Sequence, residues 1–272
     1  AAGAEFAEID IHPFPDGESL VRLPGELPAQ VVFFTSLDRP NDRLVELELA
    51  AGAARDLGAT ELTLVAPYLC YMRQDTAFRP GEAVSQRIIG EWLARRFHTL
   101  VTVDPHLHRT RSLAEAVPVR RAVTLTAGPA MAAALLARCD APLLIGPDAE
   151  SEQWVGRIAN LAGLDFGVAR KRRAGDRDVQ ITLPDMALAG RNIVLVDDVA
   201  SSGQTLVQAA LELARRDAGS VSVMVTHALF VDDALDQLAA AGVSDITSTD
   251  SIRHPTNRIE LADLLAAGLE AD

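Results

Sequence analysis

The chain has 272 residues, of which 49% are hydrophobic and 23% are charged, and its formal net charge is −13. This length and apolar content are typical of one large or two moderate folded domains with a sizeable core. The excess of acidic residues argues against nucleic acid as a partner, because such binders present a broad basic face. No apolar run reaches the length of a membrane span and no leader pattern opens the chain, so we expect a cytoplasmic protein without a membrane partner.

Apolar segments of strand length and helix length alternate along the chain. In chain order they predict a strand at 31–34, a helix at 42–57, a strand at 62–66, a helix at 85–97 with Ser85 as its N-cap, and a strand at 99–103. The pattern continues with a helix at 129–137, a strand at 142–145, a helix at 152–161, and strands at 165–169, at 178–182 and from 193 up to Asp197. A helix after Thr205, a strand at 220–226, a helix at 232–241, a strand at 245–248 and a last helix at 261–269 complete it.

Repeated β-α units of this kind indicate an α/β fold with parallel sheets and helices on both faces. A basic stretch with proline and glycine at 117–128 predicts a boundary between two similar halves, with domains at 1–123 and 124–272. The last helix could pack back on the N-terminal domain. Ligands of such sheets bind beyond the carboxyl ends of the strands, where the motifs described next fall.

Residues 193–205, Ile-Val-Leu-Val-Asp-Asp-Val-Ala-Ser-Ser-Gly-Gln-Thr, predict a buried strand, a loop of small residues and a helix N-terminus. Such a junction offers backbone N–H groups, hydroxyls and the positive end of a helix dipole to a phosphate. Asp197 and Asp198, just upstream, could hold sugar hydroxyls or a metal. Similar strand-loop-helix junctions also occur in α/β proteins in which the junction binds no ligand. The predicted sugar-phosphate site therefore needs support from other motifs.

Positive charge is concentrated in the run Arg170-Lys171-Arg172-Arg173, and Lys171 is the only lysine among 25 basic residues. A compact ammonium can enter a crowded site that a guanidinium cannot. A single lysine kept inside a basic cluster therefore indicates a functional position, although a chain poor in lysine could also place its last one there by chance.

Phe14, Asp16 and Glu18 surround a short turn that contains glycine. The aromatic face could stack on a base while the carboxylates accept hydrogen bonds from its amino group. An ordinary exposed turn is the alternative for so short a motif.

Three further motifs follow predicted strands. Arg73, Gln74 and Asp75 form a set that could grasp a phosphate, or an ordinary surface ion pair. His106 could bind a metal or be solvated. Asp148 is either a ligand for a hard cation such as magnesium or a helix cap.

The two cysteines, Cys70 and Cys139, lie in apolar contexts without metal-ligand spacing. We expect buried thiols here, and neither a disulfide nor a zinc site.

Taken in chain order, these motifs resemble those of the ribose-phosphate pyrophosphokinase family, the phosphoribosyl diphosphate synthetases. The Lys-Arg-Arg and Asp-Asp motifs together separate this family from ordinary phosphoribosyltransferases. The resemblance covers nearly the whole chain and includes residues 14–18, 41–46, 71–75, 79–85, 104–106, 147–148, 171–173 and 197–205. It implies two similar phosphoribosyltransferase-like domains, each a mostly parallel sheet flanked by helices.

The resemblance also implies an activity and a set of site residues. The enzyme would be a transferase of nucleotide biosynthesis that moves the β,γ-diphosphoryl group of ATP to the 1-hydroxyl of ribose 5-phosphate, giving phosphoribosyl diphosphate and AMP.

By this resemblance Phe14, Asp16 and Glu18 contact adenine in a neighbouring subunit's site, so that the protein would self-associate as a homo-oligomer. Arg73, Gln74 and Asp75 would hold ATP, and His106 and Asp148 would bind Mg²⁺. Asp197 and Asp198 would take the ribose hydroxyls, with Ser201, Ser202, Gly203 and Thr205 around the 5-phosphate. Lys171 and Arg173, on a flap, would stabilise charge on the transferred phosphates.

Several positions depart from the family pattern. Glu150 and Ser151 replace the usual Gly-Gly, Ser201 stands where aspartate is usual, Gln204 where glycine is usual, and Pro105 where leucine is usual. The family's first strand and helix, ahead of the turn at 14–18, are mostly missing, so we expect that the chain could be trimmed. Three alternatives therefore stay open: a non-catalytic relative with a binding or regulatory role, a phosphoribosyltransferase, and a synthetase with altered donor or sugar specificity.

Overall fold

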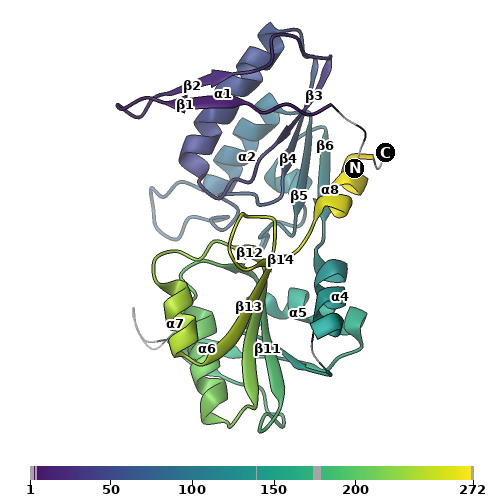
Figure 1. Cartoon of the computed structure of the whole chain (residues 1–272). Helices are drawn as coiled ribbons and strands as arrows, with labels where there is room; N and C mark the ends of the chain where they lie inside the picture. Colours follow the sequence, from purple (N-terminus) through teal and green to yellow (C-terminus); the bar gives the residue numbers. More distant parts are fainter. Residues whose placement is uncertain (1–2, 4, 139, 174–178, 271–272) are drawn as a thin grey trace. The chain divides into compact units, whose positions relative to one another are not determined.

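The computed structural model describes residues 3, 5–138, 140–173 and 179–270 (Figure 1). It divides into two compact units, the first formed by Ala1–Leu125 with Ala262–Asp272 and the second by Thr126–Leu261. Cys70 is a buried free thiol, as predicted, whereas Cys139 lies outside the described residues. Among the helices of the described ranges, none is long and apolar enough to cross a membrane.

The first unit is built on a parallel sheet. Its four strands follow one another in space in the order β3 (Gln30–Phe34), β4 (Glu61–Ala66), β5 (Thr99–Val103) and β6 (Arg121–Leu125). Its helices are α1 (Pro40–Asp56), α2 (Ser85–Arg96), α3 (Leu113–Ala116) and α8 (Ala262–Glu270). Helix α8, drawn in yellow at the end of the chain in Figure 1, packs on β5 and β6. An antiparallel hairpin of β1 (Asp10–Pro13) and β2 (Ser19–Arg22) completes the unit.

Helix α1 shows why these segments form where they do. It starts with a proline, carries Asp42 in its first turn and Arg55 in its last turn, which suits the helix dipole. Its buried residues are Leu47, Ala50, Ala51 and Ala54, which recur at helical spacing and face the core. Local sequence and packing thus agree on this helix.

The second unit contains a six-stranded parallel sheet. Its strand order is β14 (Asn257–Ile259), β13 (Val243–Thr249), β12 (Ser220–Ala228), β11 (Asn192–Ala200), β7 (Leu143–Gly146) and β8 (Phe166–Val168). Its helices are α4 (Gly128–Arg138), α5 (Glu152–Ala162), α6 (Gln204–Arg215), α7 (Ala234–Ala240) and the short 3₁₀ helix η1 (Ala149–Ser151). A separate antiparallel pair consists of β9 (Arg170–Arg173) and β10 (Val179–Thr182).

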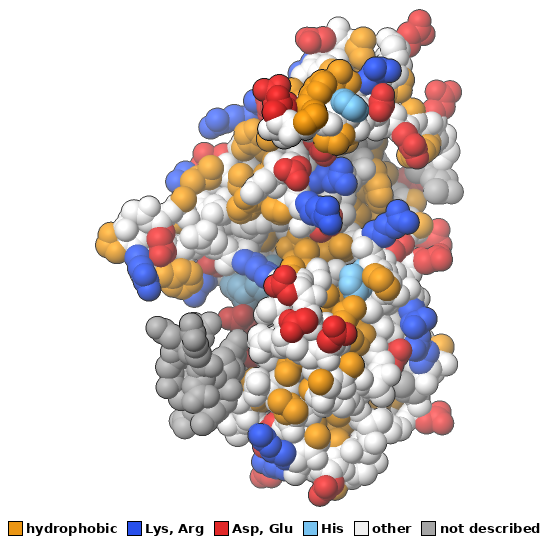
Figure 2. All heavy atoms as spheres, turned by 60° about the vertical axis from the view of Figure 1, so that its left-hand side comes forward, with side chains coloured by type: hydrophobic (Ala, Val, Ile, Leu, Met, Phe, Trp, Pro, Cys, Tyr) orange, Lys and Arg blue, Asp and Glu red, His pale blue; other side chains and the backbone are white. Residues whose placement is uncertain are grey.

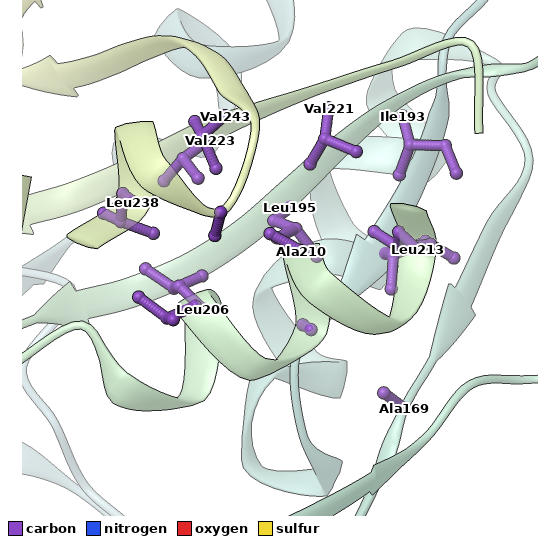
Figure 3. Packing of buried hydrophobic residues seen from close by; sticks show 14 of the residues in the cluster. Ala169, Ile193, Leu195, Leu206, Ala210, Leu213, Val221, Val223, Leu238 and Val243 are labelled. Atoms are coloured by element: carbon purple, nitrogen blue, oxygen red, sulfur yellow. The ribbon is translucent and has the colours of Figure 1, made fainter. Parts of the chain in front are cut away.

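The core of the second unit lies where α6 and α7 cover β11 and β12 (Figure 3). Leu195 of β11 and Leu213 of α6 are fully buried, and Leu206 at the start of α6 is 1% exposed. Burying one leucine side chain contributes about 1.5–3 kcal/mol relative to leaving it exposed. This packing fixes both β11 and α6, and therefore both ends of the loop that joins them.

The α/β architecture with parallel sheets and flanking helices is confirmed, but several local predictions are wrong. Ser85 is not the N-cap of α2: Val84 takes that position, and the Ser85 hydroxyl instead donates to Gln74 Oε1 at 2.6 Å. The predicted boundary is not among these errors: the division between the two units at Leu125 and Thr126 falls inside the stretch 117–128, and β6 within that stretch completes the first sheet. The hairpin β1–β2 and the short strand β14 were not predicted, because strands of three or four residues leave little periodicity to detect. The predicted domain bounds, 1–123 and 124–272, stay a prediction.

Candidate active site

Asp197 and Asp198 form the centre of the candidate site in the second unit. Both lie near the carboxyl end of β11, and the Asp198 backbone N–H donates to Asp197 Oδ1 at 3.0 Å. Asp198 is 2% exposed. Asp197 is partly exposed. Burial, and then the nearby carboxylates of Asp198 and Asp148, raise the pKa of Asp197 well above its ordinary value. The structure thus gathers three predicted site residues into an acidic cluster that a cation or hydroxyl donors would stabilise.

Asp148 follows β7 and is the N-cap of η1. Its Oδ1 accepts from the Glu150 backbone N–H at 3.1 Å, and the Ser151 hydroxyl donates to its carbonyl at 2.6 Å. Ser151 is fully buried against Gly146, where a Cβ would lie 2.4 Å from Ser151 Oγ. The residues at 150 and 151 therefore make a capping box that holds the Asp148 segment in place.

The loop between β11 and α6 carries the predicted phosphate contacts. Gly203 is the N-cap of α6 with φ 68°, a left-handed conformation that favours glycine. Ser202 is exposed, and Ser201 and Thr205 are partly exposed. Helix α6 has 12 residues, so its unpaired N-terminal N–H groups and its dipole favour an anion at this loop.

Lys171 and Arg173 lie on β9, opposite Ile181 and Val179 of β10. Their side chains, and residues 174–178, lie outside what the structure describes.

In the first unit, Arg73, Gln74 and Asp75 follow β4 and have different surroundings. Arg73 is exposed, whereas Gln74 Oε1 accepts the hydrogen bond from Ser85. The Asp75 side chain is 1% exposed and accepts from the Arg109 backbone N–H at 3.0 Å and from its guanidinium at 2.8 Å. Burial alone would raise the pKa of Asp75, but the hydrogen bonds from Arg109 outweigh it, so the pKa lies below its ordinary value. The ion-pair interpretation thus describes Asp75, and its partner Arg109 was missed.

Two strained backbone positions were also missed by sequence reasoning. Tyr71 has φ 60° and its hydroxyl donates to Asn41 Oδ1 at 2.5 Å. Asp104, which is 5% exposed at the end of β5, has φ 36°. Residues other than glycine rarely adopt such positive φ angles, and backbone strain of this kind often clusters at functional sites. The pattern of apolar residues in the sequence does not indicate a positive φ angle at either position.

His106 lies close to a second imidazole. Its Nε2 is 2.5 Å from Nε2 of His108, and the two rings meet edge to face with centroids 4.1 Å apart. One ring must donate and the other accept, so the two tautomers are linked. The structure thus pairs His106 with a neighbour two residues away in the sequence.

The turn between β1 and β2 displays the third group of candidates. Asp16 Oδ1 accepts from the Glu18 backbone N–H at 3.2 Å, and the Phe14 N–H donates to the Glu18 carbonyl at 2.7 Å. The Phe14 ring is 40% exposed and meets His12 edge to face at 5.1 Å. The hairpin therefore leaves Phe14 exposed, and the predicted stacking of its ring on a base stays a prediction.

Charge on the molecular surface agrees with the sequence composition. On the described part of the face shown in Figure 2, arginine side chains are interspersed with acidic ones and form no broad basic surface.

Comparison with known proteins finds a family model for each unit. Residues 1–95 match the N-terminal domain of ribose phosphate pyrophosphokinase, and residues 131–252 match the phosphoribosyl transferase domain. The ribose-phosphate pyrophosphokinase of Methanopyrus kandleri is 34% identical over 270 residues, which cover 98% of this chain and 91% of that protein. Ribose-phosphate pyrophosphokinase 2 of Archaeoglobus fulgidus is 34% identical over 269 residues, covering 99% of this chain and 93% of that protein.

A solved structure shows the same fold. The phosphoribosylpyrophosphate synthetase from Mycobacterium smegmatis matches with a TM-score of 0.83 over 98% of this chain and 90% of that chain, at 21% identity. The family resemblance indicated by the motifs is confirmed by relatives that align over nearly their whole length. This chain is a transferase that belongs to the ribose-phosphate pyrophosphokinase family.

Proposed function

We propose that this chain transfers the β,γ-diphosphoryl group of ATP to the 1-hydroxyl of ribose 5-phosphate. The sugar oxygen forms a bond to the β-phosphorus, the bond from that phosphorus to the α,β-bridging oxygen breaks, and AMP leaves with the electron pair. The proton of the 1-hydroxyl is lost. The observation that carries the proposal is 34% identity to a ribose-phosphate pyrophosphokinase across both units, together with the acidic cluster and the loop at the start of α6.

The second unit would hold the sugar phosphate. Carboxylates are acceptors for sugar hydroxyls, so Asp197 and Asp198 would bind the ribose ring. The amides and hydroxyls of the loop from Ser201 through Ser202 and Gly203 to Thr205 would bind the 5-phosphate, helped by the dipole of α6. An ordered loop at this position supports the assignment, because its ends are fixed by the buried core.

The first unit would hold the nucleotide through Arg73 and Gln74. Asp75 is engaged by Arg109, so we propose that it orders this segment. Phe14 would stack on adenine, with Asp16 and Glu18 beside it. Lys171 and Arg173 would stabilise the negative charge that builds on the transferred phosphates, since phosphoryl-type transfer depends mostly on positioning and electrostatics.

The proposed cofactor is Mg²⁺, with Asp148 and His106 as ligands. A carboxylate oxygen suits this hard cation, and the acidic cluster at Asp148 fits a divalent ion. An imidazole nitrogen is a less usual ligand for magnesium, so His106 rests on the family resemblance alone. When bound, the ion would neutralise phosphate charge.

We also propose that the protein self-associates through the open edge of the first sheet. Strand β3 lies at that edge, with Phe34 65% exposed and Val32 48% exposed. A pocket of about 1030 Å³ lies beside it, lined by β3, by residues 5–9 and Ile11, by residues of the segment 23–28 and by part of α1. Val32 and Phe34 are two apart and project from one face of β3, so they form an exposed apolar surface beside the unpaired backbone groups of this edge strand. A second copy of the chain offers the same surface and the same edge. Phe34→Asp should lower the mass measured by sedimentation, whereas Phe78→Asp, at a phenylalanine 72% exposed, should leave it unchanged.

The test of the activity is AMP release from ATP and Mg²⁺, measured with and without ribose 5-phosphate. We expect AMP that depends on the sugar phosphate, and a fall of orders of magnitude in Lys171→Ala. A folded protein that binds ribose 5-phosphate but releases no AMP would instead support a non-catalytic relative. In that case Glu150, Ser151 and Gln204 would be the first positions to change back to glycine.

A further inference from the structure

The loop that follows β11 is held from one side by the segment that follows β12. The Leu229 and Phe230 backbone N–H groups both donate to the Ala200 carbonyl, at 3.0 and 2.9 Å, and the Val231 N–H donates to the Ser201 carbonyl at 3.1 Å. These bonds extend the pairing of β11 with β12, whose last partners are Ala200 and Ala228. Residues 229–231 thus continue the sheet as a support under the loop.

The direction of these bonds matters for the loop amides. The C=O and N–H of one trans peptide point in opposite directions, and the described chain has no cis peptide. Because the carbonyls of Ala200 and Ser201 point to residues 229–231, the N–H groups of Ser201 and Ser202 point away from that segment. The support therefore leaves these amides on the open side of the loop.

A chain of side-chain hydrogen bonds joins the start of α6 to α7. Gln204, the first residue of α6, donates from Nε2 to Gln237 Oε1 at 2.5 Å. Gln237 in turn donates from Nε2 to Asp233 Oδ1 at 2.6 Å. The long side chain at position 204 is thus directed to α7, which explains how this loop accommodates a residue larger than glycine there.

Helix α7 also packs directly against the loop. A Cβ at Gly203 would lie 3.6 Å from Ala234 Cβ and 3.7 Å from Leu238 Cδ1, which is ordinary van der Waals contact. Leu238 is fully buried in the core that Leu206 of α6 also enters (Figure 3). Helix α7 is therefore anchored, and Gln237 on it presents a fixed partner to Gln204.

We propose that Gln237, Gln204 and residues 229–231 are positioning residues that set the phosphate loop in its anion-binding shape before the ligand arrives. This inference rests on the proposed function, because it assumes that the loop binds the phosphate of ribose 5-phosphate. None of these side chains needs to touch the substrate. Their loss should weaken binding of the sugar phosphate and leave the chemical step and the ATP site nearly unchanged.

The first test compares Gln204→Ala, Gln237→Ala and the double variant. Binding of ribose 5-phosphate without ATP is measured by calorimetry, and KM and kcat are measured separately for both substrates. One hydrogen bond of ordinary net strength corresponds to about a 2- to 10-fold change, so we expect a rise of this size in Kd and in KM for ribose 5-phosphate. The double variant should be no worse than either single one, and kcat and KM for ATP should stay within about twofold.

Gln208→Ala is the matched control, because Gln208 lies one turn further along the same helix. Unchanged binding in Gln237→Ala, additive losses in the double variant, or an equal loss in the control would overturn the inference. If the wild type itself does not bind ribose 5-phosphate, the proposed function fails and the inference fails with it. If the wild type binds and the variants bind equally well, only the positioning role fails.

The backbone support has its own test at Val231, whose side chain is 43% exposed. Val231→Ala keeps the N–H that bonds Ser201, whereas Val231→Pro removes it. We expect weaker ribose 5-phosphate binding in the proline variant than in the alanine variant, at similar unfolding midpoints. Equal binding by two folded variants would contradict the support. If the proline variant does not fold, the Gln204 and Gln237 comparison decides.

Discussion

Asp75→Ala distinguishes an ordering role for Asp75 from direct ATP binding. The wild-type carboxylate is almost fully enclosed and accepts two hydrogen bonds from Arg109. A hydrogen bond to a charged group contributes about 1.5–3 kcal/mol, which applies to the Arg109 backbone N–H. The guanidinium is 63% exposed, so its share is closer to the about 0.5–1 kcal/mol of a surface pair. We therefore expect a loss of about 2–4 kcal/mol in the free energy of unfolding, and about half of that in Asp75→Asn.

The pH dependence of this loss follows from the pKa of Asp75, which lies below its ordinary value in the folded protein. The stabilisation is therefore fully present above the unfolded-state pKa of about 3.9 and is lost as the pH falls through the folded-state pKa. Urea unfolding at pH 7 and at several acidic values should show the gap between wild type and Asp75→Ala closing at low pH.

A different result would refute the reasoning. If Asp75→Ala unfolds like the wild type at pH 7 while its KM for ATP rises strongly, Asp75 is a direct ligand of the nucleotide. A loss of stability that does not change with pH would show that the carboxylate charge is not what stabilises this segment.

Four further substitutions test other parts of the molecule. Gly90→Ala should destabilise the first unit, by about 1–3 kcal/mol or more, because the added Cβ would lie 1.8 Å from the Ala116 carbonyl oxygen. Gly52→Ala in α1, with nothing within 4 Å, should stabilise by about 0.5–1 kcal/mol in the same unfolding assay, and equal effects would refute the argument. Asp197→Asn should raise the free energy of unfolding of the ligand-free protein at pH 8. Because the pKa of Asp197 is raised in the folded protein, its ionisation lowers the wild-type stability as the pH rises above about 4. A variant less stable than the wild type at pH 8 would contradict this. Lys171→Arg should lower turnover strongly despite keeping the charge, and near-normal turnover would refute the special role of the lysine.

Most of the fold could be predicted from the sequence because its central strands and helices are strongly patterned. The run Ile193–Val196 into Asp197 reads as a buried strand ending in polar residues. The strand is confirmed, but β11 continues through both aspartates to Ala200. The Ser85 cap was predicted wrongly because the hydroxyl found a distant partner, Gln74, which local sequence does not reveal.

The candidate site was predictable as a set of residue types but not as a set of contacts. Asp148 and Asp197 are separated by 48 other residues, yet parallel pairing of β7 with β11 brings their strand ends together. The engagement of Asp75 by Arg109 depends on how two loops fold over each other, and no periodicity encodes that. The bond from Gln204 to Gln237 likewise exists only once α6 and α7 pack side by side.

The most direct test of the proposed reaction follows the phosphorus atoms of ATP by ³¹P NMR in the presence of Mg²⁺ and ribose 5-phosphate. The account predicts AMP and a sugar carrying a new diphosphate in equal amounts, without accumulation of ADP, and no such products from Lys171→Ala. ADP together with a sugar that gained a single phosphate would contradict transfer of a diphosphoryl group, because the bond broken would then lie between the β- and γ-phosphates.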